Sequence, residues 1–166
     1  MAVDPLELRA TLARFPTGVT VVGTRHVPEG VCGLTANAFT SVSLEPPLAL
    51  VCVDLSSSTH ACIEASGRLS VSILSTGQED VALWFAHKDD DKFARVAHRI
   101  GPDGLPLVDG AAAWLECTVE GSHPGGDHTI FVARVDRVER PQEELAPLVF
   151  HRGSYTTVQG LPVLGG

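Results

Sequence analysis

The segment at residues 33–43 reads Gly33-Leu34-Thr35-Ala36-Asn37-Ala38-Phe39-Thr40-Ser41-Val42-Ser43. Most of its side chains are small or neutral and polar, and none carries a charge. Such a surface lets a flat ligand approach the backbone closely, because hydroxyls, an amide and main-chain N–H groups can serve as hydrogen-bonding partners. The segment therefore predicts a strand that also forms the floor of a binding site.

Short β-branched and apolar stretches flank this segment and predict further strands. Residues 19–24 form one of them, and a turn at Pro28-Glu29-Gly30 joins it to the arm that begins at Val31. Residues 48–53 are a continuous apolar run, which predicts a central strand covered on both faces. Other strands are expected at residues 69–74, 113–120 and 127–139, with a connection at 121–126 and a last strand at 149–150 or 155–158.

The predicted helices are short. Asp4 can cap a helix that has Pro5 in its first turn and that ends before Pro16. Further helices are expected after the serines at residues 56–58, ending at Gly67, and at residues 78–86 and 93–97. Because no strand–helix–strand repeat is sustained, the pattern favours a closed antiparallel barrel over a doubly wound parallel sheet.

Composition narrows the classes of partner. The 166 residues are 44% hydrophobic and 19% charged, which is typical of one globular domain. The formal net charge of −8 argues against a nucleic-acid backbone and against an anionic membrane surface as partners. No apolar run approaches the roughly 20 residues that a membrane-spanning helix needs. Residues 1–5 lack a basic region followed by an apolar core, so we expect a cytoplasmic protein.

Cysteine and histidine spacing predicts no metal site. The four cysteines are scattered and show no CxxC spacing, so we expect reduced, mostly buried thiols at Cys32, Cys52, Cys62 and Cys117. The seven histidines never occur at HExxH or HxH spacing. The sequence also lacks a GxGxxG turn, a phosphate-binding P-loop and a GxSxG elbow.

Three short motifs each allow two interpretations. The run Ser56-Ser57-Ser58-Thr59 can cap a helix, or its hydroxyls and N–H groups can hold a phosphate at the helix N-terminus. The run Gly125-Gly126-Asp127-His128 is either a turn with a surface histidine or a histidine with open space beside it at the start of a strand. Lys92-Phe93 is either a surface cation with a core ring or a part of the same site.

Several stretches, in this order and spacing, carry a resemblance to a known family. They are Arg14-Phe15-Pro16-Thr17-Gly18-Val19, Gly33-Leu34-Thr35-Ala36-Asn37-Ala38-Phe39, Ser41-Val42-Ser43-Leu44-Glu45-Pro46-Pro47-Leu48, Ser70-Val71-Ser72-Ile73-Leu74, Lys92-Phe93, Leu115-Glu116-Cys117 and Gly126-Asp127-His128. Together they resemble the flavin reductase-like domain family. These are small split-barrel FMN-binding proteins that act as reductase components of two-component flavin-dependent monooxygenases. The resemblance spans about residues 5–158.

The resemblance implies a fold and a set of site residues. Residues 1–166 are implied to form a single domain, a mainly β, six-stranded antiparallel Greek-key split barrel with flanking short helices. Two copies are implied to form a homodimer, with a flavin near the subunit interface. The residues implied at the isoalloxazine ring are Thr35, Ala36, Asn37, Ser41, Val42 and Ser43, with Cys52, Val53 and Asp54 on the strand beside it. Those implied at the phosphate are Ser58, Thr59 and Lys92, with Phe93 packing on the ribityl chain or ring. His128 is implied to position the nicotinamide, and Tyr155 to lie at the same mouth.

The resemblance also implies an activity, an NAD(P)H:flavin oxidoreductase. Such an enzyme passes hydride from NAD(P)H to N5 of FMN or FAD and supplies reduced flavin to a partner monooxygenase. NADH is slightly favoured over NADPH, because no cluster of arginines marks a site for a 2′-phosphate. Two alternatives stay open: a split-barrel oxidase or oxygenase that retains its flavin as a prosthetic group, and a non-enzymatic flavin-binding protein.

Overall fold

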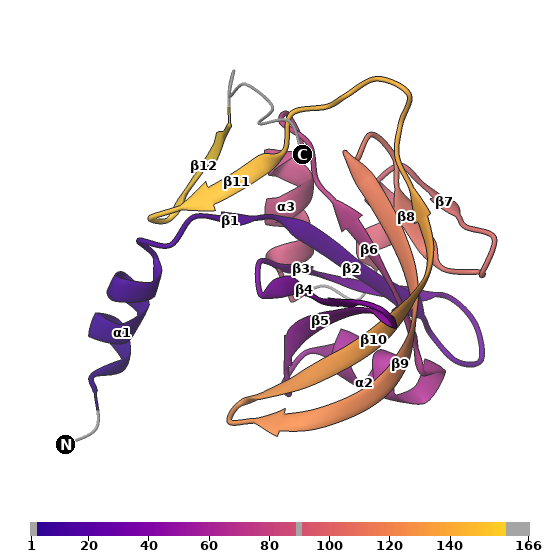
Figure 1. The fold of residues 1–166 in the computed structure, drawn as a ribbon, viewed down its shortest axis with the longest axis horizontal. Helices are drawn as coiled ribbons and strands as arrows, with labels where there is room; N and C mark the ends of the chain where they lie inside the picture. Colours follow the sequence, from indigo (N-terminus) through magenta and orange to yellow (C-terminus); the bar gives the residue numbers. More distant parts are fainter. Residues whose placement is uncertain (1–2, 89–90, 159–166) are drawn as a thin grey trace.

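The structure, a computed structural model, describes residues 3–88 and 91–158 (Figure 1). The predicted domain of residues 1–166 thus includes 1–2, 89–90 and 159–166, which lie outside the described part. In chain order the elements are α1 (Pro5–Leu12), β1 (Thr17–Gly18), β2 (Thr20–Arg25), β3 (Val31–Ala36), β4 (Phe39–Leu44), β5 (Pro47–Asp54), α2 (Ser58–Ser66), β6 (Arg68–Ile73), α3 (Glu79–Ala86), the 3₁₀ helix η1 (Lys92–Arg95), β7 (His98–Ile100), β8 (Pro106–Val108), β9 (Ala113–Gly125), β10 (His128–Glu139), β11 (Leu148–His151) and β12 (Ser154–Thr157).

The protein is mainly β and its strands pair antiparallel, as predicted. Over the described residues the main sheet has seven strands in the order β3-β2-β6-β9-β10-β5-β4, and β1, β11 and β12 form a smaller sheet. β7 and β8 pair as a hairpin beside the main sheet. Within residues 3–88 and 91–158, no helix is long and apolar enough to cross a membrane.

The main sheet curves back on itself because its two edge strands follow each other in the chain. β3 ends at Ala36 and β4 begins at Phe39, yet they lie at opposite ends of the strand order. Only Asn37 and Ala38 separate them, and the Cys52 N–H donates to the Ala38 carbonyl at 3.0 Å. The predicted strand through residues 33–43 is therefore broken in the middle. This break is why the described main sheet has seven strands where six were predicted.

The interior of the curved sheet is filled by alternating side chains. On β5, Ala49, Val51 and Val53 are buried, whereas Leu50 and Cys52 between them are half-buried. β5 pairs with both β10 and β4, so it lies inside the sheet as predicted. The prediction that both of its faces are covered was wrong, because only the face with Ala49, Val51 and Val53 is buried. α2 contributes Ile63 to the same core.

A second apolar cluster lies where α3 and η1 pack against β2 and β3. Phe85 and Phe93 meet edge to face with ring centroids 4.7 Å apart. A Cβ on Gly33 would lie 2.7 Å from the ring of Phe93 and 2.8 Å from that of Phe85. Because no side chain fits between these rings and the strand, Gly33 lets α3 and η1 pack directly on β3.

Two elements, α1 and the β9–β10 hairpin, extend from the body of the fold (Figure 1). α1 begins as predicted, with Asp4 Oδ1 accepting the N–H groups of Leu6 at 2.9 Å and Glu7 at 3.1 Å. None of its residues is buried, and Figure 1 shows it extending away from the main sheet. The β9–β10 hairpin is longer than predicted, because residues 121–125 continue β9 up to a tight turn at Gly126, whose φ is +77°.

The cysteines differ from the prediction. Cys32 on β3 and Cys62 on α2 form a disulfide, so the expectation of four reduced thiols was wrong. Cys52 and Cys117 are free thiols. Burial raises the pKa of the Cys117 thiol to about 12, which keeps it protonated and unreactive.

Candidate functional site

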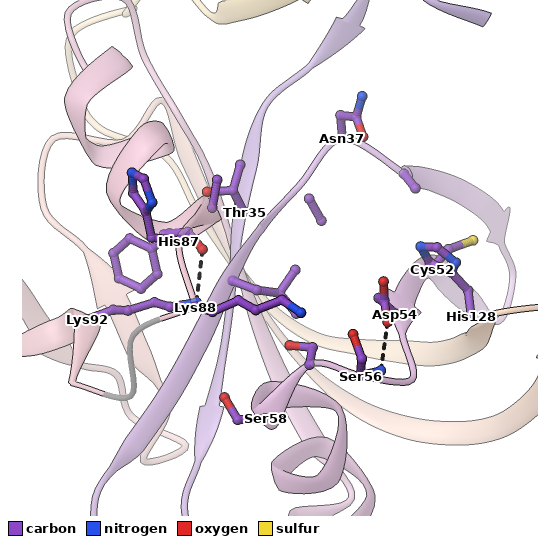
Figure 2. Close-up of a pocket in the computed structure, with 16 residues that line it drawn as sticks. Thr35, Asn37, Cys52, Asp54, Ser56, Ser58, His87, Lys88, Lys92 and His128 are labelled. Atoms are coloured by element: carbon purple, nitrogen blue, oxygen red, sulfur yellow. Dashed lines mark hydrogen bonds between the residues drawn. The ribbon is translucent and has the colours of Figure 1, made fainter. Parts of the chain in front are cut away.

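A pocket of about 370 Å³ opens between the β3–β4 bend, the end of β5, the start of α2 and the end of α3 (Figure 2). The residues that line it are Leu34, Thr35, Ala36, Asn37, Ala38, Cys52, Asp54, Ser56, Ser57, Ser58, Phe85, Ala86, His87, Lys88, Lys92 and His128. Eight of the predicted site residues are thus brought together: Thr35, Ala36, Asn37, Cys52, Asp54, Ser58, Lys92 and His128.

The floor of the pocket is backbone and small side chains. The Thr35 hydroxyl donates to the Ala82 carbonyl at 2.6 Å, so it fastens β3 to α3 and does not face the pocket as a donor. Ala36 and Ala38 add little bulk, and Asn37 lies at the bend (Figure 2). This floor can accept a flat ring, with the Asn37 amide as a polar group at its edge.

Asp54 shapes the end of the pocket where α2 begins. Its Oδ1 accepts the Ser56 N–H at 2.6 Å, and its carbonyl accepts the Ser57 N–H at 3.0 Å. Hydrogen bonds from the Ser56 backbone and side chain lower the pKa of Asp54, so the carboxylate stays ionised and holds the turn. The N-cap residue Ser57 makes no side-chain capping bond. The helix-capping interpretation of the serine run is therefore wrong for Ser57, and the phosphate interpretation stays a prediction.

The pocket contains two lysines in different roles. Lys92 is buried, and its Nζ donates to the carbonyls of Gly33 at 3.1 Å and Phe85 at 3.0 Å, so it joins η1 to β3 and α3. Lys88 extends from the end of α3 across the pocket toward Asp54 and Ser56 (Figure 2). The sequence predicted Lys92 but neither Lys88 nor His87, and it included Ser56 and Ser57 only in the phosphate interpretation of residues 56–59. The position of Lys88 directly after an amphipathic helix was the signal that could have found it.

His128 lies at the rim of the pocket, at the first position of β10. It pairs with Asp54 of β5 across the sheet, which places it beside Cys52 (Figure 2). Its Nδ1 lies 2.7 Å from Asp127 Oδ1, so the carboxylate orients the ring and leaves Nε2 for another partner.

The other predicted residues lie outside the pocket lining. Ser41, Val42 and Ser43 follow the bend on the exposed strand β4. Val53 and Thr59 are both buried. Val53 lies between Cys52 and Asp54 on β5 and points into the core. The remaining two are Phe93, which packs under β3, and Tyr155, which contacts Phe150 in the small sheet.

Comparison with known proteins identifies the family. The chain matches the model of the flavin reductase like domain over residues 12–159. It is 40% identical over 158 residues to the reductase subunit HsaB of a flavin-dependent monooxygenase of Mycobacterium tuberculosis, a match that covers 95% of this chain and 84% of that protein. The chain belongs to the flavin reductase-like domain family.

Other members of this family are similar over nearly their whole length. An NADH-dependent flavin reductase of a Rhodococcus species is 43% identical over 161 residues, covering 95% of this chain and 88% of that protein. The solved structure of the NADH:FAD oxidoreductase SgcE6 of Streptomyces globisporus has a TM-score of 0.88 at 38% identity, covering 96% of this chain and 98% of that one. The solved structure of nitrilotriacetate monooxygenase component B of Mycobacterium thermoresistibile has a TM-score of 0.91 at 36% identity. This match covers 98% of this chain and 93% of that one. The predicted family is confirmed.

The donor set of the pocket fits a flavin. A flat, small-residue floor lies at one end, and serine hydroxyls with the cation of Lys88 lie at the other. This arrangement matches a ring system with an anionic tail. Over the described residues, no group of three or more His, Cys, Asp and Glu side chains is placed to hold a metal ion.

Proposed function

We propose that this protein is an NAD(P)H:flavin oxidoreductase that reduces FMN or FAD and supplies the reduced flavin to a partner monooxygenase. The observation that carries the proposal is one pocket with a flat floor at the β3–β4 bend, a serine and lysine end at α2, and His128 at the rim. The relatives support it, since they include reductase subunits of flavin-dependent monooxygenases and an NADH-dependent flavin reductase.

The isoalloxazine ring would lie on the floor formed by residues 35–37. Thr35 and Ala36 offer backbone groups, and Asn37 offers its amide, while Cys52 lies beside them on β5. When bound, the flavin accepts a hydride from the nicotinamide at N5. The contribution of the floor is to fix the ring plane, so that the nicotinamide can reach only its open face.

The flavin phosphate would lie at the start of α2. Ser56, Ser57 and Ser58 offer hydroxyls there, and Lys88 offers the charge. Lys92 lines the same pocket and supports its shape through hydrogen bonds to the carbonyls of Gly33 and Phe85, while the buried residues Val53, Thr59 and Phe93 lie outside the lining.

His128 would position the nicotinamide. Asp127 orients its ring, so that Nε2 can donate to or accept from the dinucleotide. Near-attack placement of two reactants contributes about 7–11 kcal/mol to lowering a barrier, so hydride transfer here needs no separate acid–base pair.

The curved sheet corresponds to a split barrel in this proposal. If β3 and β4 count as one strand bent at Asn37 and Ala38, then the main sheet becomes a six-stranded Greek-key barrel. The whole chain would form one such domain.

A second copy of the chain would cover the exposed apolar surface of α1 and β4. Leu6, Leu12 and Phe15 near the N-terminus and Leu44 on β4 are exposed, Leu44 at 94%. A homodimer would bury these groups and bring Tyr155 and the β4 residues Ser41, Val42 and Ser43 near an interface. We expect a dimeric mass by light scattering, and a monomeric mass for a Leu6→Glu, Leu12→Glu variant; a monomeric wild type would contradict the homodimer.

The direct test of the activity is NADH oxidation with and without added FMN, FAD and riboflavin. Turnover that depends on added flavin supports the reductase. A yellow protein whose turnover ignores added flavin would instead indicate a retained prosthetic group. A protein that binds flavin and leaves NADH unoxidised would be a flavin-binding protein.

A further inference from the structure

His60 is a buried histidine outside the pocket lining that connects two parts of the site. It lies in the first turn of α2 and is 6% exposed. Its Nε2 lies 2.8 Å from the hydroxyl oxygen of Thr129, which directly follows His128 on β10. The backbone N–H of His60 donates to the carbonyl of Ser57, the N-cap residue of α2, at 3.0 Å.

The surroundings of His60 favour a specific, directed contact. The ring packs against Phe131 with centroids 5.3 Å apart, and Thr129 is buried as well. Glu64 Oε2 lies 3.7 Å from His60 Nδ1. A nearby carboxylate favours the proton on Nδ1, which leaves Nε2 to accept the Thr129 hydroxyl. A buried hydroxyl without this acceptor would lose its partner, so the contact is costly to break.

We infer that His60 is a positioning residue that sets the spacing between the phosphate end and the nicotinamide end of the site. The inference rests on the proposed function. Ser57 and Ser58 begin α2, and His128 begins β10, so one side-chain bond joins the two elements that carry these ends. His60 touches neither flavin nor nicotinamide in this account and acts through Thr129 and the helix.

The chain offers a matched control at the other end of α2. Ser66 Oγ lies 2.7 Å from Thr24 Oγ1 on β2, and this hydroxyl pair fastens the last turn of the helix to the sheet. The pair does not involve β10. Ser66 Oγ also accepts the Arg68 N–H at 3.2 Å, so Ser66→Ala weakens the anchoring of α2 to β2 and to the start of β6. It leaves the contact between His60 and Thr129 in place.

The test compares His60→Leu, Thr129→Val and Ser66→Ala in flavin-dependent NADH oxidation, FMN affinity and thermal unfolding. We expect His60→Leu and Thr129→Val to lower kcat/KM for NADH about ten- to a hundredfold, since displacements near 1 Å can cost this much. FMN affinity should change by less than about threefold.

The double variant should be no slower than the slower single variant, because both remove the same bond. His60→Gln, which keeps a polar group near the position of Nε2, should recover much of the rate. Ser66→Ala should lower the Tm while kcat/KM stays unchanged.

Two outcomes would overturn the inference. One is a lowered Tm with wild-type kcat/KM in His60→Leu and Thr129→Val, which would make the contact merely structural. The other is an equal loss of kcat/KM in Ser66→Ala. If His60→Leu fails to fold, Thr129→Val carries the same test, because it removes only a hydroxyl. A wild-type protein that fails to oxidise NADH with any flavin would instead overturn the proposed function.

Discussion

Lys88 and Lys92 lie close together in the chain but have different surroundings. Lys92 satisfies the carbonyls of Gly33 and Phe85 and holds η1 in place. Lys88 points across the pocket toward the serines of α2 (Figure 2). At the scale of single residues, the proposed flavin site therefore depends on Lys88 for charge and on Lys92 for shape.

Lys88→Met should weaken FMN binding about ten- to a hundredfold, because a hydrogen bond to a charged group contributes roughly 1.5–3 kcal/mol. Riboflavin has no phosphate, so its affinity should stay unchanged. Flavin fluorescence titrations measure both. The matched control, Lys92→Met, leaves two carbonyls unsatisfied and should lower the stability by about 1–3 kcal/mol. Equal losses for FMN and riboflavin in Lys88→Met would show that Lys88 does not contact the phosphate.

At the scale of elements, α2 is the helix on which the site depends. Its N-terminus supplies Ser58, its first turn supplies His60, and Cys62 joins it to β3 through the disulfide with Cys32. Since β3 contributes Leu34, Thr35 and Ala36 to the pocket lining, this disulfide connects the pocket floor to the helix that carries the proposed phosphate end.

Reduction of the Cys32–Cys62 disulfide should lower the stability by about 2–4 kcal/mol, because the closed loop in the unfolded chain is lost. Thermal unfolding with and without a dithiol reductant measures the change. A Cys32→Ser, Cys62→Ser variant should unfold at the lower temperature in both conditions. Thiol titration of the denatured protein should find two thiols before reduction and four after it. Four thiols before reduction would contradict the bond.

Local patterns predicted most elements and about half of the site. The Asp4 cap, the β2–β3 hairpin and the Gly67 stop of α2 are confirmed, because capping and turn chemistry act over a few neighbouring residues. The bend at Asn37 and Ala38 was missed, since it depends on β4 pairing with β5 at the far edge of the sheet.

Site residues were predicted least well where side-chain direction decided the outcome. Cys52 and Asp54 line the pocket, but Val53 between them points into the core, because successive strand residues face opposite sides. Lys92 and Lys88 are both cations near the same helix end, and only the tertiary contacts separate them. The disulfide joins elements that are distant in the sequence, so spacing could not reveal it.

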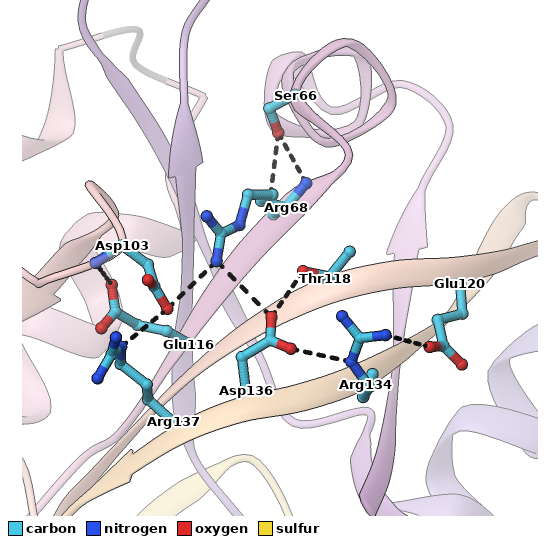
Figure 3. A network of polar contacts seen from close by, with 9 residues as sticks. All are labelled: Ser66, Arg68, Asp103, Glu116, Thr118, Glu120, Arg134, Asp136 and Arg137. Carbon is cyan, nitrogen blue, oxygen red and sulfur yellow. Dashed lines mark hydrogen bonds and ion pairs between the residues drawn. The ribbon is translucent and has the colours of Figure 1, made fainter. Parts of the chain in front are cut away.

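At the scale of the whole molecule, a network of charged groups crosses the outer face of the sheet (Figure 3). Arg68 of β6 pairs with Asp103 at 3.2 Å and with Asp136 of β10 at 3.6 Å. Arg134 Nε donates to Asp136 at 3.0 Å, and the Thr118 hydroxyl donates to it at 2.6 Å. The network thus connects β6, β9 and β10 on the side of the sheet that the core does not cover.

Asp136 should make stability depend on pH. Its partial burial opposes ionisation, but hydrogen bonds from Thr118 and Arg134 and the charges of Arg134 and Arg68 outweigh this and lower its pKa below the ordinary value of an aspartate. A group whose pKa is lower in the folded state than in the unfolded state stabilises the fold at any pH above its unfolded-state pKa. That stabilisation is lost as the pH falls through the folded-state pKa. Wild type should therefore be more stable than Asp136→Asn at pH 7, and the difference should shrink below a pH of about 4. Urea unfolding over this pH range measures it, and a pH-independent difference would contradict the assignment.

The most direct test of the whole account is anaerobic rapid mixing of the FMN-loaded protein with NADH, followed by the absorbance of oxidised flavin. We predict that the wild type bleaches the flavin, and that His128→Ala does so at least about tenfold more slowly with nearly unchanged FMN affinity, because His128 at the rim positions the nicotinamide. Flavin that stays oxidised in the wild type, or a His128→Ala variant that reduces it at the wild-type rate, would contradict the account.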